Sequence, residues 1–145
     1  MASGDCKRFV NSTCKHGQLA EFDKQDRKEK PGKRKRPVIL IPNNGMGHAP
    51  VELGHKLIQT YLGLLDLEDR RPAAICLYGE GVKLATEGSP VLDELCALAG
   101  KDIPVIVCTT CLNHFGLLDS LQAGAAGSMK DIIALQWAAK KVITL

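Results

Sequence analysis

The chain has 145 residues, a hydrophobic fraction of 45% and a net charge of +3, which suits one ordinary domain with a substantial core. Aromatic residues make up only 4%, which argues against a nucleic-acid surface built on base stacking. The sequence contains neither the ~20-residue apolar stretch of a membrane-spanning helix nor the apolar core of a secretory signal. We therefore predict a soluble cytoplasmic protein that binds neither a membrane nor nucleic acid.

The basic charge is concentrated at the start of the chain. Residues 1–36 carry 11 Lys and Arg against 5 Asp and Glu, whereas residues 37–145 carry 8 against 11. So polar a segment cannot bury enough surface to offset the entropy lost on ordering. We predict a charged, flexible N-terminal tail or linker over residues 1–36 and one domain over residues 37–145. The basic run 33–36 is interpreted as a solvated linker in preference to a nucleic-acid contact or an address signal.

From Pro37 onward, strand patterns alternate with helix patterns. Short apolar runs predict strands at 38–41, 73–78, 103–107 and 141–145, with a weaker candidate in 121–125. Apolar residues at helical spacing predict helices over 50–66, 91–99 and 129–140, and a short helix is predicted over 111–118. Ser89 and Ser128 are candidate N-caps, and Gly100 is a candidate stop. The alternation predicts an α/β fold with a mostly parallel sheet of about four to five strands flanked by helices.

A Cys-x-x-Cys pair, Cys108 and Cys111, stands where the third predicted strand ends and a helix can begin. Open α/β sheets place their sites at the carboxyl ends of their strands. Unpaired N–H groups at a helix start carry partial positive charge, which favours a thiolate. Such a pair supports disulfide exchange, a carried persulfide or half of a metal site, while simple space-filling remains the alternative.

A structural zinc site would need two further ligands beside the cysteine pair. Cys6, Cys14 and His16 are available in the sequence, but they lie in the predicted tail without a matching second pair. We therefore predict no metal and no cofactor.

Two loops are expected at the same edge of the sheet as the cysteines. The loop after the first strand is rich in glycine, which exposes backbone N–H groups to an anion, although a plain tight turn is an equal alternative. The loop after the second strand carries Lys83, which can attract an anionic sulfur species, and Glu87, which can accept a proton. A histidine just beyond the second cysteine can tune that thiol. The candidate substrate-binding residues are Asn43, Asn44, Gly45, Met46, Gly47, Lys83, Glu87 and His114.

Several motifs recur together along residues 38–145. They are Gly45-Met46-Gly47 followed by Glu52-Leu53-Gly54, the block Gly81–Leu92, Cys108-Thr109-Thr110-Cys111-Leu112, Phe115-Gly116-Leu117 and the strand at 141–145. This combination resembles the DsrE-like sulfur-relay family, most closely the C-terminal domain of the YedF-like proteins that are assigned to selenium metabolism. The chain departs from that pattern at Asn113-His114-Phe115, where the family has Asp-Tyr-Tyr, and at Glu80, where the family has Asn.

The resemblance implies a three-layer α/β/α sandwich, a homo-oligomer and a sulfurtransferase-like role. Sulfur, or selenium, would be held on cysteine as a persulfide-type group, with Cys108 at the carrier position and Cys111 as the resolving or proton-sharing thiol. The partners would be sulfur donor and acceptor proteins or small sulfur species. We expect Cys108 to be the more accessible thiol; the opposite order stays open because a helix start lowers the pKa of a thiol. The competing class is a non-enzymatic oligomeric module that binds a ligand or partner and uses the cysteines structurally or as a redox sensor.

Overall fold

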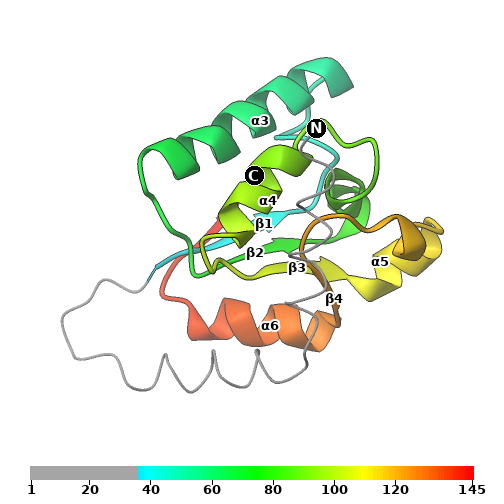
Figure 1. Ribbon diagram of the computed structural model, residues 1–145. Coiled ribbons are helices and arrows are strands. Elements are labelled where there is room, and N and C mark those ends of the chain that lie inside the picture. Colours follow the sequence, from blue (N-terminus) through cyan, green and yellow to red (C-terminus); the bar gives the residue numbers. More distant parts are fainter. Residues whose placement is uncertain (1–35) are drawn as a thin grey trace.

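Five short strands form one parallel sheet in the order β4-β3-β2-β1-β5 (Figure 1). The computed structural model describes residues 36–145, so the predicted tail, including Cys6, Cys14 and His16, lies outside the described residues except for its last position. The weakly indicated fifth strand exists, but it lies at 125–127 and not within 121–125. The strands are β1 (Val38–Ile41), β2 (Ala74–Leu77), β3 (Val105–Cys108), β4 (Ala125–Gly127) and β5 (Val142–Thr144).

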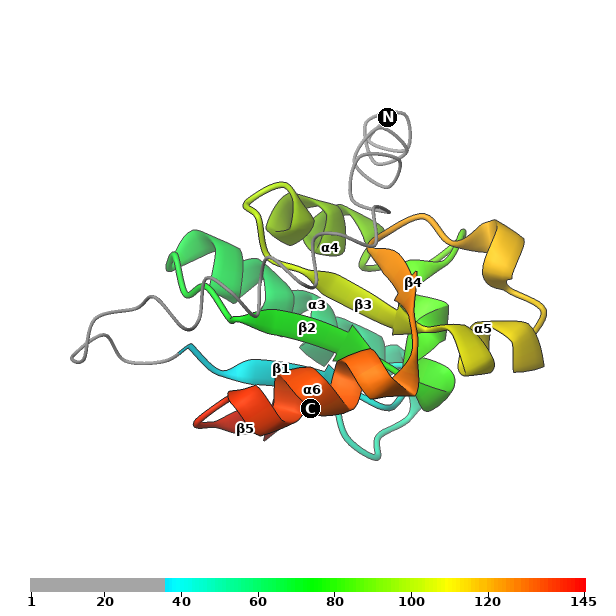
Figure 2. The same cartoon turned by 90° about the horizontal axis from the view of Figure 1, so that it is seen from below.

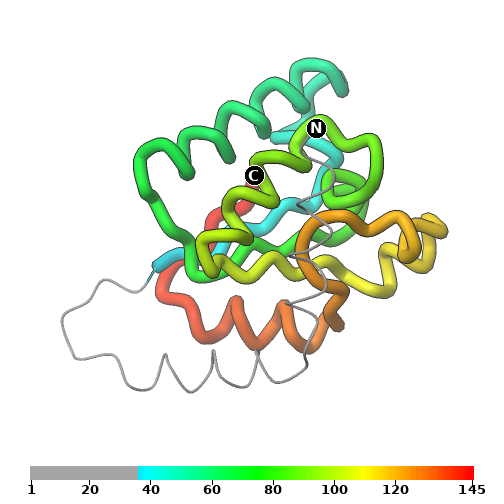
Figure 3. Tube along the Cα trace, viewed as in Figure 1, coloured from blue at the N-terminus to red at the C-terminus, as the bar shows by residue number. Residues whose placement is uncertain are grey.

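Helices cover both faces of this sheet. Helices α3 (Val51–Leu67) and α4 (Leu92–Ala99) lie on one face and α6 (Met129–Ala138) lies on the other (Figures 1 and 3). The chain steps from β1 to β2 to β3 in one direction, and right-handed crossovers place α3 and α4 on the same face. The chain then returns from β4 past the whole sheet to β5, so the same handedness places α6 on the opposite face. The three-layer α/β/α sandwich is thereby confirmed.

The central strands form the core of the domain. Every residue of β1, β2 and β3 is buried, as expected for parallel strands that are covered on both faces. The last strand pairs with β1, and the N–H of Leu145 donates to the carbonyl of Leu40 at 3.0 Å. The chain end is therefore held in the sheet, as its apolar sequence predicts.

The helix boundaries follow the sequence signals in part. Ser128 forms the predicted N-cap of α6 in a complete capping box with Asp131. Ser89 does not cap α4, because the N-cap position is Val91; its hydroxyl instead accepts the N–H of Val91 at 3.2 Å and stabilises the preceding turn. Helix α5 (Thr109–His114) starts directly after β3, two residues earlier than predicted. It ends before the predicted residue 118, and the chain continues to a separate 3₁₀ turn, η2 (Leu118–Ser120).

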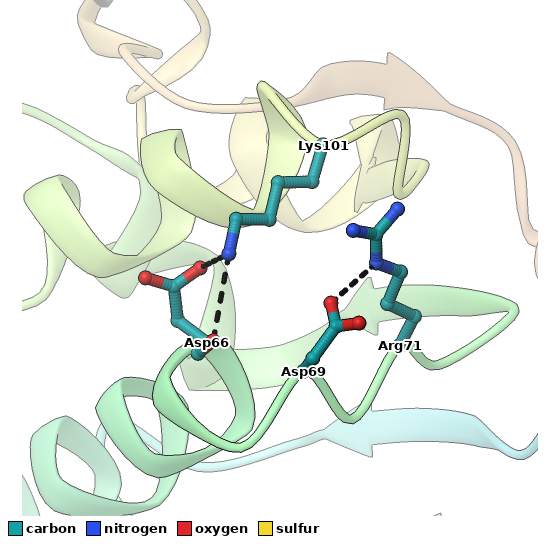
Figure 4. A network of polar contacts seen from close by, with 4 residues as sticks. All are labelled: Asp66, Asp69, Arg71 and Lys101. Atoms are coloured by element: carbon teal, nitrogen blue, oxygen red, sulfur yellow. Dashed lines mark hydrogen bonds and ion pairs between the residues drawn. The ribbon is translucent and has the colours of Figure 1, made fainter.

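Polar contacts join the C-terminal end of α3 to the turn between α4 and β3 (Figure 4). The ammonium of Lys101 pairs with the carboxylate of Asp66 and donates to its carbonyl at 3.4 Å. Arg71 donates to Asp69 at 2.7 Å, and this hydrogen bond, with the charge of Arg71, lowers the pKa of that carboxyl group. Because Asp69 and Arg71 are exposed, their pair orients the turn more than it stabilises the fold.

The thiol of Cys76 lies in the middle of β2 with no exposed surface, and burial raises its pKa to about 12. The unfolded thiol ionises near its ordinary value of 9.0, so the contribution of Cys76 to stability is complete below that pH and is lost as the pH rises toward 12. We expect the difference in unfolding free energy between the wild type and Cys76→Ala to shrink above pH 9.0 by up to ~1.4 kcal/mol per pH unit. Denaturant unfolding of both proteins from neutral pH upward measures this difference. A difference that does not change with pH would contradict the raised pKa of Cys76.

Candidate functional site

Three segments lie at the carboxyl end of the sheet: the loop that joins β1 to α3, the 3₁₀ helix η1 (Gly79–Ala85) after β2, and α5 after β3 (Figure 2). The sequence predicts only a loop where η1 forms. This short helix contacts both other segments, because the N–H of Gly81 donates to the carbonyl of Pro42 at 3.2 Å and the N–H of Gly79 donates to the sulfur of Cys111 at 3.1 Å. Segments that are distant in sequence thus meet through η1.

Two glycines allow η1 to approach the end of β1. Gly79 has a φ of 58°, and a methyl group on it would lie 2.9 Å from the carbonyl oxygen of Pro42. A methyl group on Gly81 would overlap the carbonyl oxygen of Ile41. Because neither residue has a side chain, η1 can lie against the end of β1, and in that position the Gly79 N–H reaches the sulfur of Cys111.

The two cysteines differ in exposure. Cys108 is the last residue of β3 and has 0% of its surface exposed, whereas Cys111 lies in the first turn of α5 and is half-buried. The expectation that Cys108 is the more accessible thiol is therefore wrong. The reason is that Cys108 still belongs to a strand covered on both faces, while Cys111 lies one helical turn beyond the sheet.

The surroundings of the Cys111 thiol shift its pKa in both directions. Partial burial is the largest influence and raises the pKa, the hydrogen bond from the Gly79 N–H lowers it, and the neighbouring Cys108 thiol raises it. The net direction is upward, which is opposite to what a helix-start position predicts by itself. The Cys111 thiol is therefore protonated at neutral pH, with one backbone donor already directed at its sulfur.

Lys83 links η1 to α5. Its ammonium lies 4.6 Å from the centre of the Phe115 ring and 3.9 Å from the carboxylate of Glu80. The exposed His114 packs edge-on against the same ring, with the ring centres 5.0 Å apart. The cation–π contact holds η1 against α5, and it places one positive charge at this end of the sheet.

A polar cleft of about 200 Å³ opens on the other side of η1. Most of the predicted loop residues line it, but Met46 packs against the core instead. Neither cysteine is among the lining residues of this cleft, so it does not contain the thiols. The cleft is lined by Asn43, Asn44, Gly45, Gly47, His48, Ala49, Val51, Gly54 and Glu80.

The predicted site residue Glu87 lies outside the cleft, whereas Glu80, which was not predicted, lines it. Glu87 is exposed, and its N–H donates to the carbonyl of Ser120 at 2.9 Å, so it lies at the junction of the segment after η1 with η2. Sequence reasoning did not select Glu80, although its position directly after a strand-ending glycine was a usable signal.

Within residues 36–145, no three His, Cys, Asp or Glu side chains gather into a possible metal site. In the same range, no helix has the length and apolar character to cross a bilayer.

Comparison with known proteins identifies the fold. No family model matches the chain, and no curated protein matches it significantly. Among solved structures, it is similar to the YchN protein from E. coli, with a TM-score of 0.58 and 18% identity over 76% of this chain and 99% of that one. It is also similar to MTH1491, a protein of unknown function from Methanobacterium thermoautotrophicum, with a TM-score of 0.53, 18% identity and the same coverage. At this identity the likeness shows the fold alone: the chain has the three-layer α/β architecture of these proteins.

Proposed function

We propose that this protein is a sulfur carrier in which the cysteine pair accepts and passes on a sulfane sulfur. The observation that carries the proposal is the Gly79 N–H directed at the sulfur of Cys111 at 3.1 Å, beside the buried Cys108. A partly exposed thiol with a fixed donor on one side and a second thiol on the other is a suitable place to form, hold and release a persulfide.

The reaction is a thiol–persulfide exchange without net oxidation. The thiolate of Cys111 attacks the outer sulfur of a donor R–S–SH, the S–S bond of the donor breaks, and RS⁻ leaves with the electron pair. The proton that Cys111 gives up is taken by RS⁻ through water, so the products are Cys111–S–SH and R–SH. Transfer to an acceptor thiol repeats the same steps with the protein as the donor.

The surrounding residues have distinct roles in this scheme. The Gly79 N–H donates to the sulfur as negative charge develops on it, which compensates in part for burial. In this scheme the neighbouring Cys108 attacks the inner sulfur of the persulfide, which releases HS⁻ and leaves a Cys108–Cys111 disulfide. Lys83 supplies a positive charge at the same end of the sheet, where anionic sulfur species would arrive.

The YedF-like motifs extend the proposal to selenium, because a selenol-type group would bind the same thiol by the same exchange. The polar cleft favours a second candidate function, a ligand-binding module. Its lining offers polar groups such as Asn43, Asn44 and Glu80 to a ligand and contains no cysteine, so a ligand could bind there without the thiols. In that case the Cys108–Cys111 pair would be structural or redox-sensing, and the protein would not load sulfur.

Intact mass spectrometry after incubation with a small persulfide donor tests the proposal. We expect the full chain to gain the mass of one sulfur atom and to lose it on treatment with a dithiol, because the adduct is a persulfide. Parallel incubation with a selenium donor shows whether the heavier element is also accepted. A protein that gains no such mass under conditions where a low-molecular-weight thiol is converted would support the ligand-binding module instead.

A further inference from the structure

The junction of η1 and α5 places a positive charge close to the reacting sulfur. Cys111 and Phe115 lie four residues apart on α5 and its C-cap, joined by a backbone hydrogen bond of 3.1 Å, so both side chains lie on one side of the helix. That side contacts η1 twice: Gly79 donates its N–H to the sulfur of Cys111, and the ammonium of Lys83 lies over the Phe115 ring. The two contacts are separated along α5 by one helical turn, ~5.4 Å.

The ammonium of Lys83 is held in position but has no close anionic partner. Its contact with the Phe115 ring, 4.6 Å from the ring centre, and the partial burial of its side chain, which is 37% exposed, restrict its movement. The carboxylate of Glu80 is 3.9 Å away, farther than the roughly 2.7–2.9 Å of a charge-assisted hydrogen bond. Within residues 36–145, Glu80 is the one carboxylate paired with this ammonium, so the N–H groups of Lys83 are available to a bound anion.

Glu80 loosely occupies the position of such an anion. Its side chain is 63% exposed, and an exposed ion pair of this length contributes little to stability. Glu80 also lines the polar cleft on the other side of η1, so its carboxylate stays hydrated when it leaves Lys83. An anionic group of a bound molecule can therefore replace Glu80 at Lys83 without leaving a buried charge unpaired.

We propose that Lys83 binds a carboxylate of the sulfur donor, and that this donor is a low-molecular-weight persulfide of a thiol that itself carries a carboxylate, as amino-acid and peptide thiols do. The inference rests on the proposed sulfur-carrier function. In such a persulfide a few carbon atoms separate the sulfur pair from the carboxylate, which suits a reacting thiol and an ammonium whose contacts on α5 are one helical turn apart. Lys83 then determines which donors are accepted, and Glu80 is a competitor that a neutral donor does not displace.

The exchange reaction keeps its balance with such a donor. The donor carboxylate binds Lys83 while the thiolate of Cys111 attacks the outer sulfur of the donor. The S–S bond of the donor breaks, and the carboxylate-bearing thiolate leaves with the electron pair. This thiolate takes up, through water, the proton that Cys111 gave up, so no oxidant or reductant is needed. Lys83 contributes by orienting the donor, and Glu80 returns to the ammonium when the product leaves.

Initial loading rates of the full chain with three small persulfide donors test the proposal. The donors are the persulfides of mercaptopropionate, mercaptoethanol and cysteamine, which carry a negative, no and a positive charge. We expect the wild type to load fastest from the negative donor, with a preference that weakens as salt is added. Lys83→Gln should lower the ratio of the negative-donor rate to the neutral-donor rate about fivefold, and Lys83→Arg should retain the ratio.

Two further variants separate recognition from general charge. Glu80→Gln should raise the same ratio, because it removes the competing carboxylate. Lys130→Gln changes the net charge as Lys83→Gln does, but Lys130 is exposed on α6 on the opposite face of the sheet, so the ratio should not change.

The outcomes distinguish this inference from the carrier function on which it rests. Loading from all three donors with the same ratio in the wild type and in Lys83→Gln would overturn the inference and leave the carrier function standing. An equal loss of all three rates in Lys83→Gln would show that Lys83 only holds η1 against α5, and would overturn it as well. No loading from any donor would overturn both proposals.

Discussion

Cys111→Ser should abolish sulfur loading, whereas Cys108→Ser should still load. Cys111 is the half-buried thiol that receives the Gly79 N–H, while Cys108 has no exposed surface from which to reach a donor. A hydroxyl at position 111 cannot take part in thiol–persulfide exchange, so we expect the initial loading rate to fall by ~100-fold or more. Intact mass spectrometry at short times after addition of a persulfide donor measures that rate for each variant.

The Cys108→Ser variant should differ from the wild type in release and not in loading. Without the second thiol, the persulfide on Cys111 cannot be resolved to a Cys108–Cys111 disulfide, so the adduct should persist longer. Cys76→Ala is the matched control, because its thiol is buried in β2 and should not react. If Cys108→Ser fails to load while Cys111→Ser loads normally, the carrier is Cys108, as the family resemblance implies, and the chain must open to admit the donor. If both single variants load like the wild type, the pair is structural.

Gly81→Ala should destabilise the fold by ~3 kcal/mol or more, because an added methyl group overlaps the backbone carbonyl oxygen of Ile41. Ile41 is the last residue of the buried strand β1, and Gly81 is itself buried in η1. Denaturant unfolding measures the loss of stability.

Gly63→Ala provides the control for this prediction. Gly63 lies inside α3, and a methyl group placed there would meet nothing within 4 Å. Alanine is the better helix former, so this change should stabilise the protein by ~0.5–1 kcal/mol. Equal stability of Gly81→Ala and the wild type would show that η1 is not packed against β1, and the hydrogen bond from Gly79 to Cys111 would lose its structural basis.

The local patterns of the sequence predicted most of the architecture. Continuous apolar runs identified β1, β2 and β3, because strands covered on both faces need no alternation. The edge strand β5 was identified by its apolar run as well, although Val142 and Thr144 are exposed. Ser128 identified the start of α6, because a capping box is satisfied by residues three positions apart. The strand β4 was only weakly visible, since a three-residue Ala-Ala-Gly strand carries little apolar signal and depends on its pairing with β3.

The sequence predicted the position of the cysteine pair but not the exposure of each thiol. The Cys-x-x-Cys pair was placed correctly at the end of β3, because that position depends on a strand pattern and a short spacing. The exposure of each thiol depends on which elements cover it. Burial of Cys108 overturned the expectation that it is the more accessible thiol. Desolvation raises the pKa of Cys111, which the helix start alone would lower.

By itself, the amino-acid sequence determined the order of strands and helices along the chain and the carboxyl-edge location of the cysteines, because each depends on residues close together in the chain. Only the tertiary structure decided that η1 lies between Pro42 and Cys111 and that the polar cleft excludes both thiols. These features arise from contacts between segments that are distant in the chain, such as the hydrogen bond from Gly79 to Cys111, which are 32 positions apart. No local pattern encodes contacts of that kind, because they form only when the crossovers bring the ends of separate strands to one edge of the sheet.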